Sequence, residues 1–217
     1  MEIFLAYLGM TDYRWALQVQ QSVHAHCRKT GENWVLITEH APVLTLGYRR
    51  QTEHLLLSRA ELAEKRISLV ESTRGGSVTY HGPGQLVAYP IFSTLFRSLG
   101  VRSFVTHLEE VMRYLCAQYG VAAGRRSGFP GVWVQERKIG AVGIAVQHRT
   151  SLHGFALNVN VDLDPFSYIF PCGLPNLAVT SIAQEVKDTI EMREVVQMAC
   201  HAFRTIFSAV VKEMNDE

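Results

Sequence analysis

The spacing of apolar positions along the chain predicts a succession of strands and helices. Residues 153–163 alternate strictly, with Phe155, Leu157, Val159 and Val161 on one side and small or polar residues on the other. Such alternation is typical of a strand with two different faces. Further strands are predicted at residues 2–8, 34–39, 67–70 and 85–91, and a hairpin is predicted from 131–135 and 138–147, turned at Glu136 and Arg137.

Apolar positions three and four residues apart predict helices elsewhere. The pattern is strongest over 103–119, and it also appears over 12–28, 59–66 and 191–212. Thr11 or Asp12 is placed to cap the helix at 12–28. Because strands and helices mix without strict alternation, we expect an α/β (α+β) fold in which a mixed sheet is flanked by helices. With no convincing linker, residues 1–217 are expected to form a single domain.

Composition is that of an ordinary globular protein. Of the 217 residues, 47% are hydrophobic and 19% are charged, which argues against disorder. A net charge of +1 gives no overall attraction to nucleic acid or to an anionic membrane. The first residues lack the basic segment of a signal peptide, and no apolar run approaches the roughly 18 residues of a membrane span. We therefore expect a cytoplasmic protein with neither nucleic acid nor membrane as a partner.

A glycine-rich segment, TRGGSVTYHGPGQ at residues 73–85, is the first candidate for a binding site. Glycine lets a ligand approach the backbone closely, and Tyr80 and His81 add hydrogen-bonding groups beside it. The alternative is a plain surface turn between two strands. The segment lacks the spacing of a phosphate-binding loop and of a dinucleotide-binding loop.

Cys172 is the candidate nucleophile among four cysteines, none of which belongs to a CxxC pair. It lies in FPCGLPN, a context typical of a loop, where a thiol can be exposed and rigidly held. Cys27, Cys116 and Cys200 lie in helical patterns, as expected of small core residues. A loop cysteine can also be inert, and the residue pattern alone leaves that alternative open.

Lys138 begins the apolar strand predicted at 138–147, so it lies either at a solvent-exposed edge or in a buried position that serves a purpose. An ammonium near Cys172 would favour the reactive thiolate. His81 and His153 are candidate general bases. The sequence contains neither the GxSxG motif of serine hydrolases nor a spacing of His, Cys and Asp that indicates a metal site.

Taken in order, the segments RGGSVTYHGPGQLVAYP, PGVWVQERKIGAVGIAV, HGFALNVNVDLDPFSYIFPCGLPN and TSI resemble the lipoyl(octanoyl) transferase family. The resemblance covers most of residues 40–190 and implies the catalytic fold of biotin and lipoate protein ligases. It implies transfer of an octanoyl group from octanoyl-acyl carrier protein to a lysine of a lipoyl domain, the first step of lipoate biosynthesis. The implied acceptors are the E2 subunits of 2-oxoacid dehydrogenases and the glycine cleavage H protein. Phe129, in RRSGFPGVWV, departs from the more polar run expected before Pro130.

By the same resemblance, Cys172 carries the acyl thioester, Lys138 lowers its pKa, and neither metal nor cofactor is expected. We further expect Ala141, Gly143, Ala145, Gly154 and Ala156 to leave a narrow channel for the acyl chain. Two other functions stay open, an ATP-dependent lipoate ligase and a non-catalytic module that binds acylated protein. The residues expected to line the substrate site are Arg74, Gly75, Gly76, Ser77, Val78, Thr79, Tyr80, His81, Ala141, Val142, Gly143, Gly154, Phe155 and Ala156.

Overall fold

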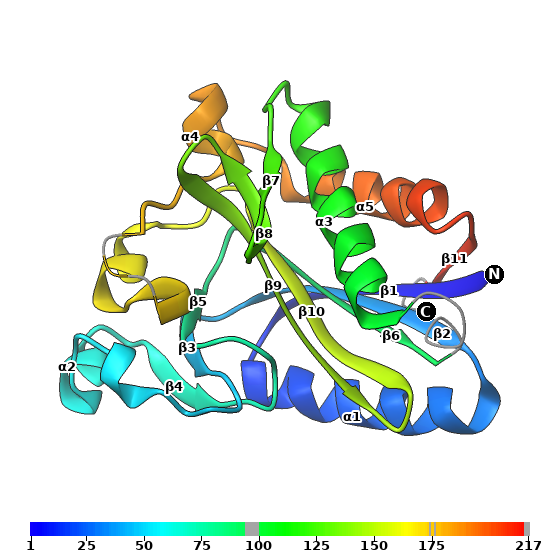
Figure 1. The fold of residues 1–217 in the computed structure, drawn as a ribbon, viewed down its shortest axis with the longest axis horizontal. Coiled ribbons are helices and arrows are strands. Elements are labelled where there is room, and N and C mark those ends of the chain that lie inside the picture. Colours follow the sequence, from blue (N-terminus) through cyan, green and yellow to red (C-terminus); the bar gives the residue numbers. More distant parts are fainter. Residues whose placement is uncertain (94–99, 174, 176, 215–217) are drawn as a thin grey trace.

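The computed structural model describes residues 1–93, 100–173, 175 and 177–214. Within them, the strands of the main sheet are β1 (Glu2–Thr11), β2 (Asn33–His40), β6 (Gln85–Phe92), β7 (Gly124–Arg126), β8 (Phe129–Val134), β9 (Arg137–Gln147), β10 (Thr150–Asn158) and β11 (Val210–Met214). Their order in the sheet is β11-β1-β2-β6-β10-β9-β8-β7 (Figure 1). Strands β11, β1 and β2 are parallel, and the other neighbours are antiparallel. The predicted mixed sheet is confirmed.

Helices cover both faces of this sheet. Helix α1 (Tyr13–Thr30) packs on one face, and α3 (Gly100–Gln118) and α5 (Met192–Ile206) pack on the other (Figure 1). Side chains alternate along β6, so that Leu86 and Ala88 face α3 and α5 while Val87 and Tyr89 face α1. Burial of both faces explains why β6 is apolar almost throughout.

A smaller sheet carries the glycine-rich segment. It consists of β3 (Val43–Leu46), β4 (Ser68–Glu71) and β5 (Thr79–His81), in the order β4-β3-β5. Its side chains, Tyr80 among them, form a second core with Phe166 and Ile169. The remaining described helical elements are α2 (Arg59–Glu64), α4 (Ile182–Val186) and the 3-10 turns η1 (Thr52–His54), η3 (Asp164–Tyr168) and η4 (Pro171–Gly173).

The ends of α1 follow from its sequence. The Asp12 side chain accepts hydrogen bonds from the backbone N–H groups of Arg14 and Trp15, at 2.8 and 3.1 Å, so Asp12 and not Thr11 is the cap. Gly31 ends the helix in the left-handed conformation, with φ at 82°.

Three predicted boundaries are wrong. The hairpin turns at residues 135–136, because Arg137 already pairs with Val134 in the β8–β9 ladder. The strand expected over 153–163 is β10, which ends at Asn158 because the next two backbone N–H groups both donate to the carbonyl of Gly84. The helix expected over 191–212 stops at Ile206, and β11 follows because its backbone completes the sheet beside β1.

Among the described helices, none combines the length and the apolar character needed to cross a membrane.

Candidate active site

A cavity lies between the glycine-rich segment and strands β6, β9 and β10. Of the residues predicted to line the substrate site, only Tyr80 is absent from its wall. Tyr80 instead packs in the second core, with its ring 5.5 Å from that of Phe166. The wall consists of Tyr13, Val87, Tyr89, His153 and the predicted residues 74–79, 81, 141–143 and 154–156.

A second, adjoining cavity contains Lys138 and Pro171 in its wall. The two cavities share Thr79, Ala141 and Ala156, so they adjoin along β9 and β10. We call the two adjoining cavities together the passage; Lys138 lines its second cavity, and Tyr13 and His153 line its first. Ala145, which we expected in the channel, lines neither cavity.

Small residues allow the glycine-rich segment to lie directly on β9. The Gly75 N–H donates to the carbonyl of Ile144 at 3.0 Å, and a Cβ on Gly143 would lie 3.0 Å from the carbonyl oxygen of Gly75. Gly154 serves the sheet itself, because a Cβ there would lie 2.0 Å from the carbonyl oxygen of Ala88 on β6. The glycine-rich segment therefore packs against β9 and forms part of the cavity wall, and it is not a plain surface turn.

Arg74 links the glycine-rich segment to strand β3 of the smaller sheet. Its guanidinium is buried and donates to the backbone oxygen of Thr45 at 2.6 Å and to the Thr45 hydroxyl at 2.9 and 3.0 Å. It also donates to the carbonyl of Gly75 at 3.0 Å. Hydrogen bonds to a buried cation are stronger than neutral ones, so this side chain holds the start of the segment in place.

Lys138 is buried, with 6% of its surface exposed, so it does not lie at a solvent-exposed edge. Its Nζ donates to the carbonyl oxygen of Pro130 at 2.8 Å and lies 5.1 Å from the centre of the Trp133 ring. Both contacts are attractive for an ammonium. The Lys138 backbone also pairs with residues 178–180, through hydrogen bonds to Ala178 and Thr180 of 2.9 and 3.0 Å.

The turn that carries Cys172 adjoins the same cavity. The N–H of Phe170 donates to the carbonyl of His54 at 2.9 Å, and Gly173 has φ at 72°. Pro171, which directly precedes Cys172, lines the cavity together with Lys138. The fold thus brings the turn that contains Cys172 to the cavity of Lys138. The Cys172 side chain lies outside the described part of the structure, so its role as nucleophile stays a prediction.

The other three cysteines are buried in the core. Burial raises the pKa of the Cys27, Cys116 and Cys200 thiols to about 12 in each case. Such thiols are protonated at neutral pH and are poor nucleophiles, in agreement with their predicted role as core residues.

The two candidate bases, His81 and His153, both line the first cavity and are almost fully buried. Burial lowers the pKa of each to about 3. Efficient general bases at neutral pH have pKa values near the working pH. These histidines are therefore better suited to lining the cavity than to acting as general bases. His81 Nδ1 lies 2.7 Å from the Gln85 side-chain oxygen, and His153 Nε2 lies 2.9 Å from the Thr73 hydroxyl.

Tyr13, Val87 and Tyr89 are wall residues that the sequence analysis missed. The Tyr13 hydroxyl donates to the Ser72 hydroxyl at 3.0 Å, and the Tyr89 hydroxyl lies 2.6 Å from His40 Nε2. The alternation along β6 places Val87 and Tyr89 on one face, which was the available signal. No signal pointed to Tyr13, because α1 reaches the cavity only through tertiary packing.

In the part of the chain that the structure describes, no group of three or more His, Cys, Asp or Glu side chains could hold a metal ion.

Comparison with known proteins places the chain in a family. Residues 12–204 match the model of the lipoyl protein ligase A/B catalytic domain. An octanoyltransferase of Desulfotalea psychrophila is 46% identical over 197 residues, which cover 88% of each chain. An octanoyltransferase of Caldicellulosiruptor saccharolyticus is 39% identical over 220 residues, covering 100% of this chain and 94% of that protein.

Solved structures with the same fold have much lower identity. A lipoate-protein ligase A bound with ATP gives a TM-score of 0.84 at 18% identity, over 100% of this chain and 90% of that one. A bipartite lipoate protein ligase from Thermoplasma acidophilum gives 0.83 at 19% identity, over 100% and 88%. The resemblance found in the sequence is confirmed: the chain belongs to the lipoyl protein ligase A/B catalytic domain family, in which these two curated relatives are octanoyltransferases.

Proposed function

We propose that the protein is an octanoyltransferase that acts in protein lipoylation and carries the acyl group as a thioester on Cys172. The octanoyltransferase relatives support octanoyl transfer as the reaction and acyltransferase as the enzyme class. The observation that carries the proposal is the buried Lys138 in the passage, in the cavity that Pro171 of the Pro171–Gly173 turn also lines.

The reaction consists of two acyl transfers, the first from the carrier thiol to Cys172 and the second from Cys172 to the amine of the acceptor lysine. The Cys172 thiolate attacks the thioester carbonyl of octanoyl-acyl carrier protein, the bond to the carrier sulfur breaks, and the departing carrier thiolate takes a proton from the Lys138 ammonium. The amine of the acceptor lysine then attacks the enzyme thioester, an amide bond forms, and Cys172 leaves as thiolate. Lys138 stabilises the thiolate by its charge and, when neutral, accepts the proton that the acceptor amine loses. Because the donor is already a thioester, no ATP is consumed.

The wall that β9 contributes to the passage is longer than an eight-carbon chain. Strand β9 rises about 3.3 Å per residue, so the wall from Lys138 to Gly143 is about 16 Å long. An extended octanoyl group is about 9 Å long, given carbon–carbon bonds of about 1.5 Å. The apolar side chains of the wall include Val78, Val142 and Phe155. The chain carbons would therefore lie against the small and apolar side chains of β9 and β10.

The partners follow from the same proposal. The donor is octanoyl-acyl carrier protein, and the acceptors are lipoyl domains of E2 subunits and the glycine cleavage H protein. One fold neighbour is described with its E2 lipoyl domain, which supports that acceptor class. Residues 1–217 act as one catalytic domain, in the cytoplasm, with no cofactor.

A second candidate is ATP-dependent ligation, because a fold neighbour is described as bound with ATP. The two functions differ in their donor. We expect the purified protein to octanoylate a lipoyl domain from octanoyl-acyl carrier protein without nucleotide, and to fail with free octanoate plus ATP and Mg²⁺. The reverse pattern would assign the protein to the ligases.

A further inference from the structure

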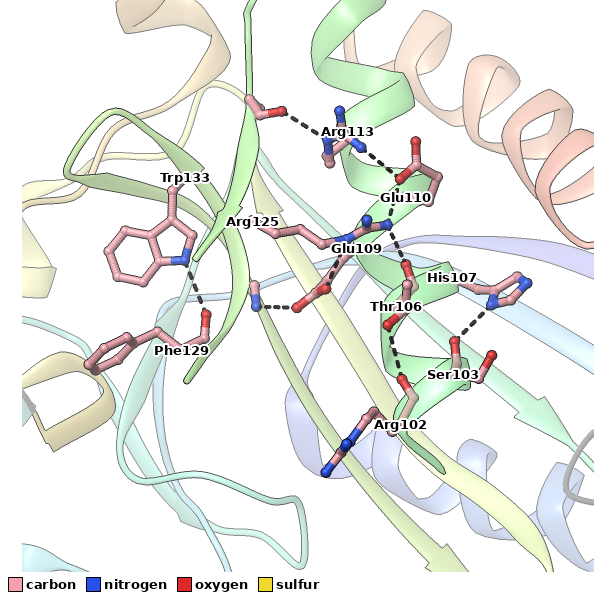
Figure 2. Close-up of polar contacts among 12 residues, drawn as sticks. Arg102, Ser103, Thr106, His107, Glu109, Glu110, Arg113, Arg125, Phe129 and Trp133 are labelled. Carbon is pink, nitrogen blue, oxygen red and sulfur yellow. Dashed lines mark hydrogen bonds and ion pairs between the residues drawn. The ribbon is translucent and has the colours of Figure 1, made fainter. Parts of the chain in front are cut away.

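A buried carboxylate on α3 contacts the loop that holds Lys138. Glu109 is 7% exposed, and its Oε1 accepts a hydrogen bond from the backbone N–H of Gly131 at 2.8 Å. Its other oxygen lies 3.2 Å from Arg125 Nε on β7 (Figure 2). A buried carboxylate is costly unless donors satisfy it, and here both of its oxygens have one.

The Gly131 N–H and the Pro130 carbonyl belong to one peptide group. That carbonyl accepts the hydrogen bond from Lys138 Nζ at 2.8 Å. Because a peptide group is planar, a partner that fixes the direction of the N–H also fixes the direction of the C=O. A carboxylate on the N–H further polarises the group and makes the carbonyl a stronger acceptor. Glu109 and Lys138 thus bind the two ends of one rigid dipole.

Only glycine fits at residue 131. Its φ is 121°, and a Cβ there would lie 2.4 Å from the carbonyl oxygen of Gly140 and 2.8 Å from Lys138 Cε. The bare backbone therefore lies directly against the lysine side chain. The Trp133 side chain, whose ring faces Lys138, donates from its indole N–H to the carbonyl of Phe129 at 3.2 Å (Figure 2).

We infer that Glu109 is a positioning residue for Lys138, which acts through the peptide group between Pro130 and Gly131. Arg125 supports it, because its guanidinium contacts Glu109 and donates to the carbonyl of Thr106 on the same helix at 3.1 Å. The inference rests on the proposed function, in which Lys138 acts on the reacting groups. Loss of Glu109 frees the peptide to rotate and the lysine amine to leave its place.

Glu110 provides a matched control. It contacts the same Arg125 and also Arg113, but its side chain is 40% exposed, and the Gly131 N–H donates to Glu109 instead. Glu109→Ala and Glu110→Ala therefore both remove a carboxylate from Arg125, and only the first removes the contact to the peptide group. Glu109→Gln keeps an oxygen that can accept from Gly131.

Lys138 accessibility is read by reductive methylation and mass spectrometry of its peptide, with the exposed Lys187 as the reference. In Glu109→Ala we expect methylation of Lys138 to rise about 2- to 10-fold, the factor of one lost hydrogen bond. In Glu110→Ala and Glu109→Gln it should stay near the parent value. Cys116, buried on the same helix, should remain unreactive in every variant, which shows that α3 is intact. If Glu109→Ala does not fold, Glu109→Asp takes its place, since its shorter side chain loses the same contact.

Octanoyl transfer gives the second readout. Glu109→Ala should lower kcat about 10- to 100-fold, the effect of a misplaced reacting group, and leave the KM for octanoyl-acyl carrier protein nearly unchanged. Equal methylation and equal kcat in Glu109→Ala and Glu110→Ala would overturn the inference. Full transfer by Cys172→Ala would overturn the proposed function instead, and the methylation pattern would still decide the role of Glu109.

Discussion

At the scale of single residues, Lys138 differs from every other described lysine in its burial. Its ammonium has a carbonyl and an indole ring as partners, and it lines the cavity beside the turn of Cys172. A buried charge acts on a neighbouring thiol with less screening than a surface charge does. We therefore expect its charge to set the ionisation of that thiol.

Lys138→Met should raise the pH midpoint for alkylation of Cys172 by iodoacetamide, because the thiolate loses a nearby positive charge. Lys138→Arg should keep the low midpoint but lose transfer to lysine, since arginine does not release its proton at these pH values. The measurement is mass spectrometry of the Cys172 peptide after timed alkylation between pH 5 and 10. Lys187→Met serves as the exposed control, and a midpoint in Lys138→Met equal to that control would exclude the electrostatic role.

At the scale of elements, the pairing of β9 with β10 builds the wall of the passage. The register places Ala141 opposite Ala156 and Gly143 opposite Gly154, so small residues meet across the ladder. Ala141 and Ala156 line both cavities. We therefore expect an acyl chain that occupies both cavities to contact these two side chains.

Ala141→Val and Ala156→Val should penalise an octanoyl donor more than a butanoyl donor. Extra methyl groups in a packed wall cost about 1–3 kcal/mol, or about 5- to 150-fold in kcat/KM. Ala145→Val, on the same strand but outside both cavities, should change neither value much. Competition between the two donors, followed by mass spectrometry of the lipoyl domain, gives the ratio directly. An equal loss for both donors would mean that these residues support the fold and do not line the acyl site.

The sequence predicted elements well where a local pattern decides them. Asp12 marks the start of α1, and the apolar spacing over 103–119 predicts α3. The glycine-rich motif predicts residues that line the cavity. The sequence did not predict features that depend on contacts with residues distant in the chain. Residues 210–214 become a strand only because β1 offers a free edge, and Tyr13 reaches the cavity only through packing of α1 on the sheet. The contacts of Glu109 and Lys138 with the peptide group between Pro130 and Gly131 join α3, β8 and β9, and no local sequence pattern predicts them.

At the scale of the whole molecule, three neutral histidines next to the cavity make stability depend on pH. Burial lowers the pKa of His40 to about 4 and the pKa of His81 and His153 to about 3. In the unfolded chain each returns to about 6.5. The unfolded state therefore binds more protons below that pH, and the stability present above pH 6.5 is lost as the pH falls toward 3.

At pH 5, each of these histidines should lower the free energy of unfolding by about 2 kcal/mol relative to pH 7.5, and the three together by about 6 kcal/mol. Urea unfolding followed by circular dichroism at the two pH values measures the difference. His153→Asn, in which asparagine tolerates the positive φ of 58° at this position, should reduce the loss by about a third. An unchanged free energy between pH 7.5 and pH 5 would contradict the neutral state of these residues.

The central claim, an acyl thioester on Cys172, is tested most directly by the mass of the protein itself. After incubation with octanoyl-acyl carrier protein and no nucleotide, intact mass spectrometry should show one added octanoyl group that hydroxylamine removes. The group should map to the Cys172 peptide, and a lipoyl domain should take it up. Cys27→Ala, Cys116→Ala and Cys200→Ala should keep the adduct, and Cys172→Ala should lose both the adduct and the transfer. A Cys172→Ala protein that still transfers octanoate would contradict the account.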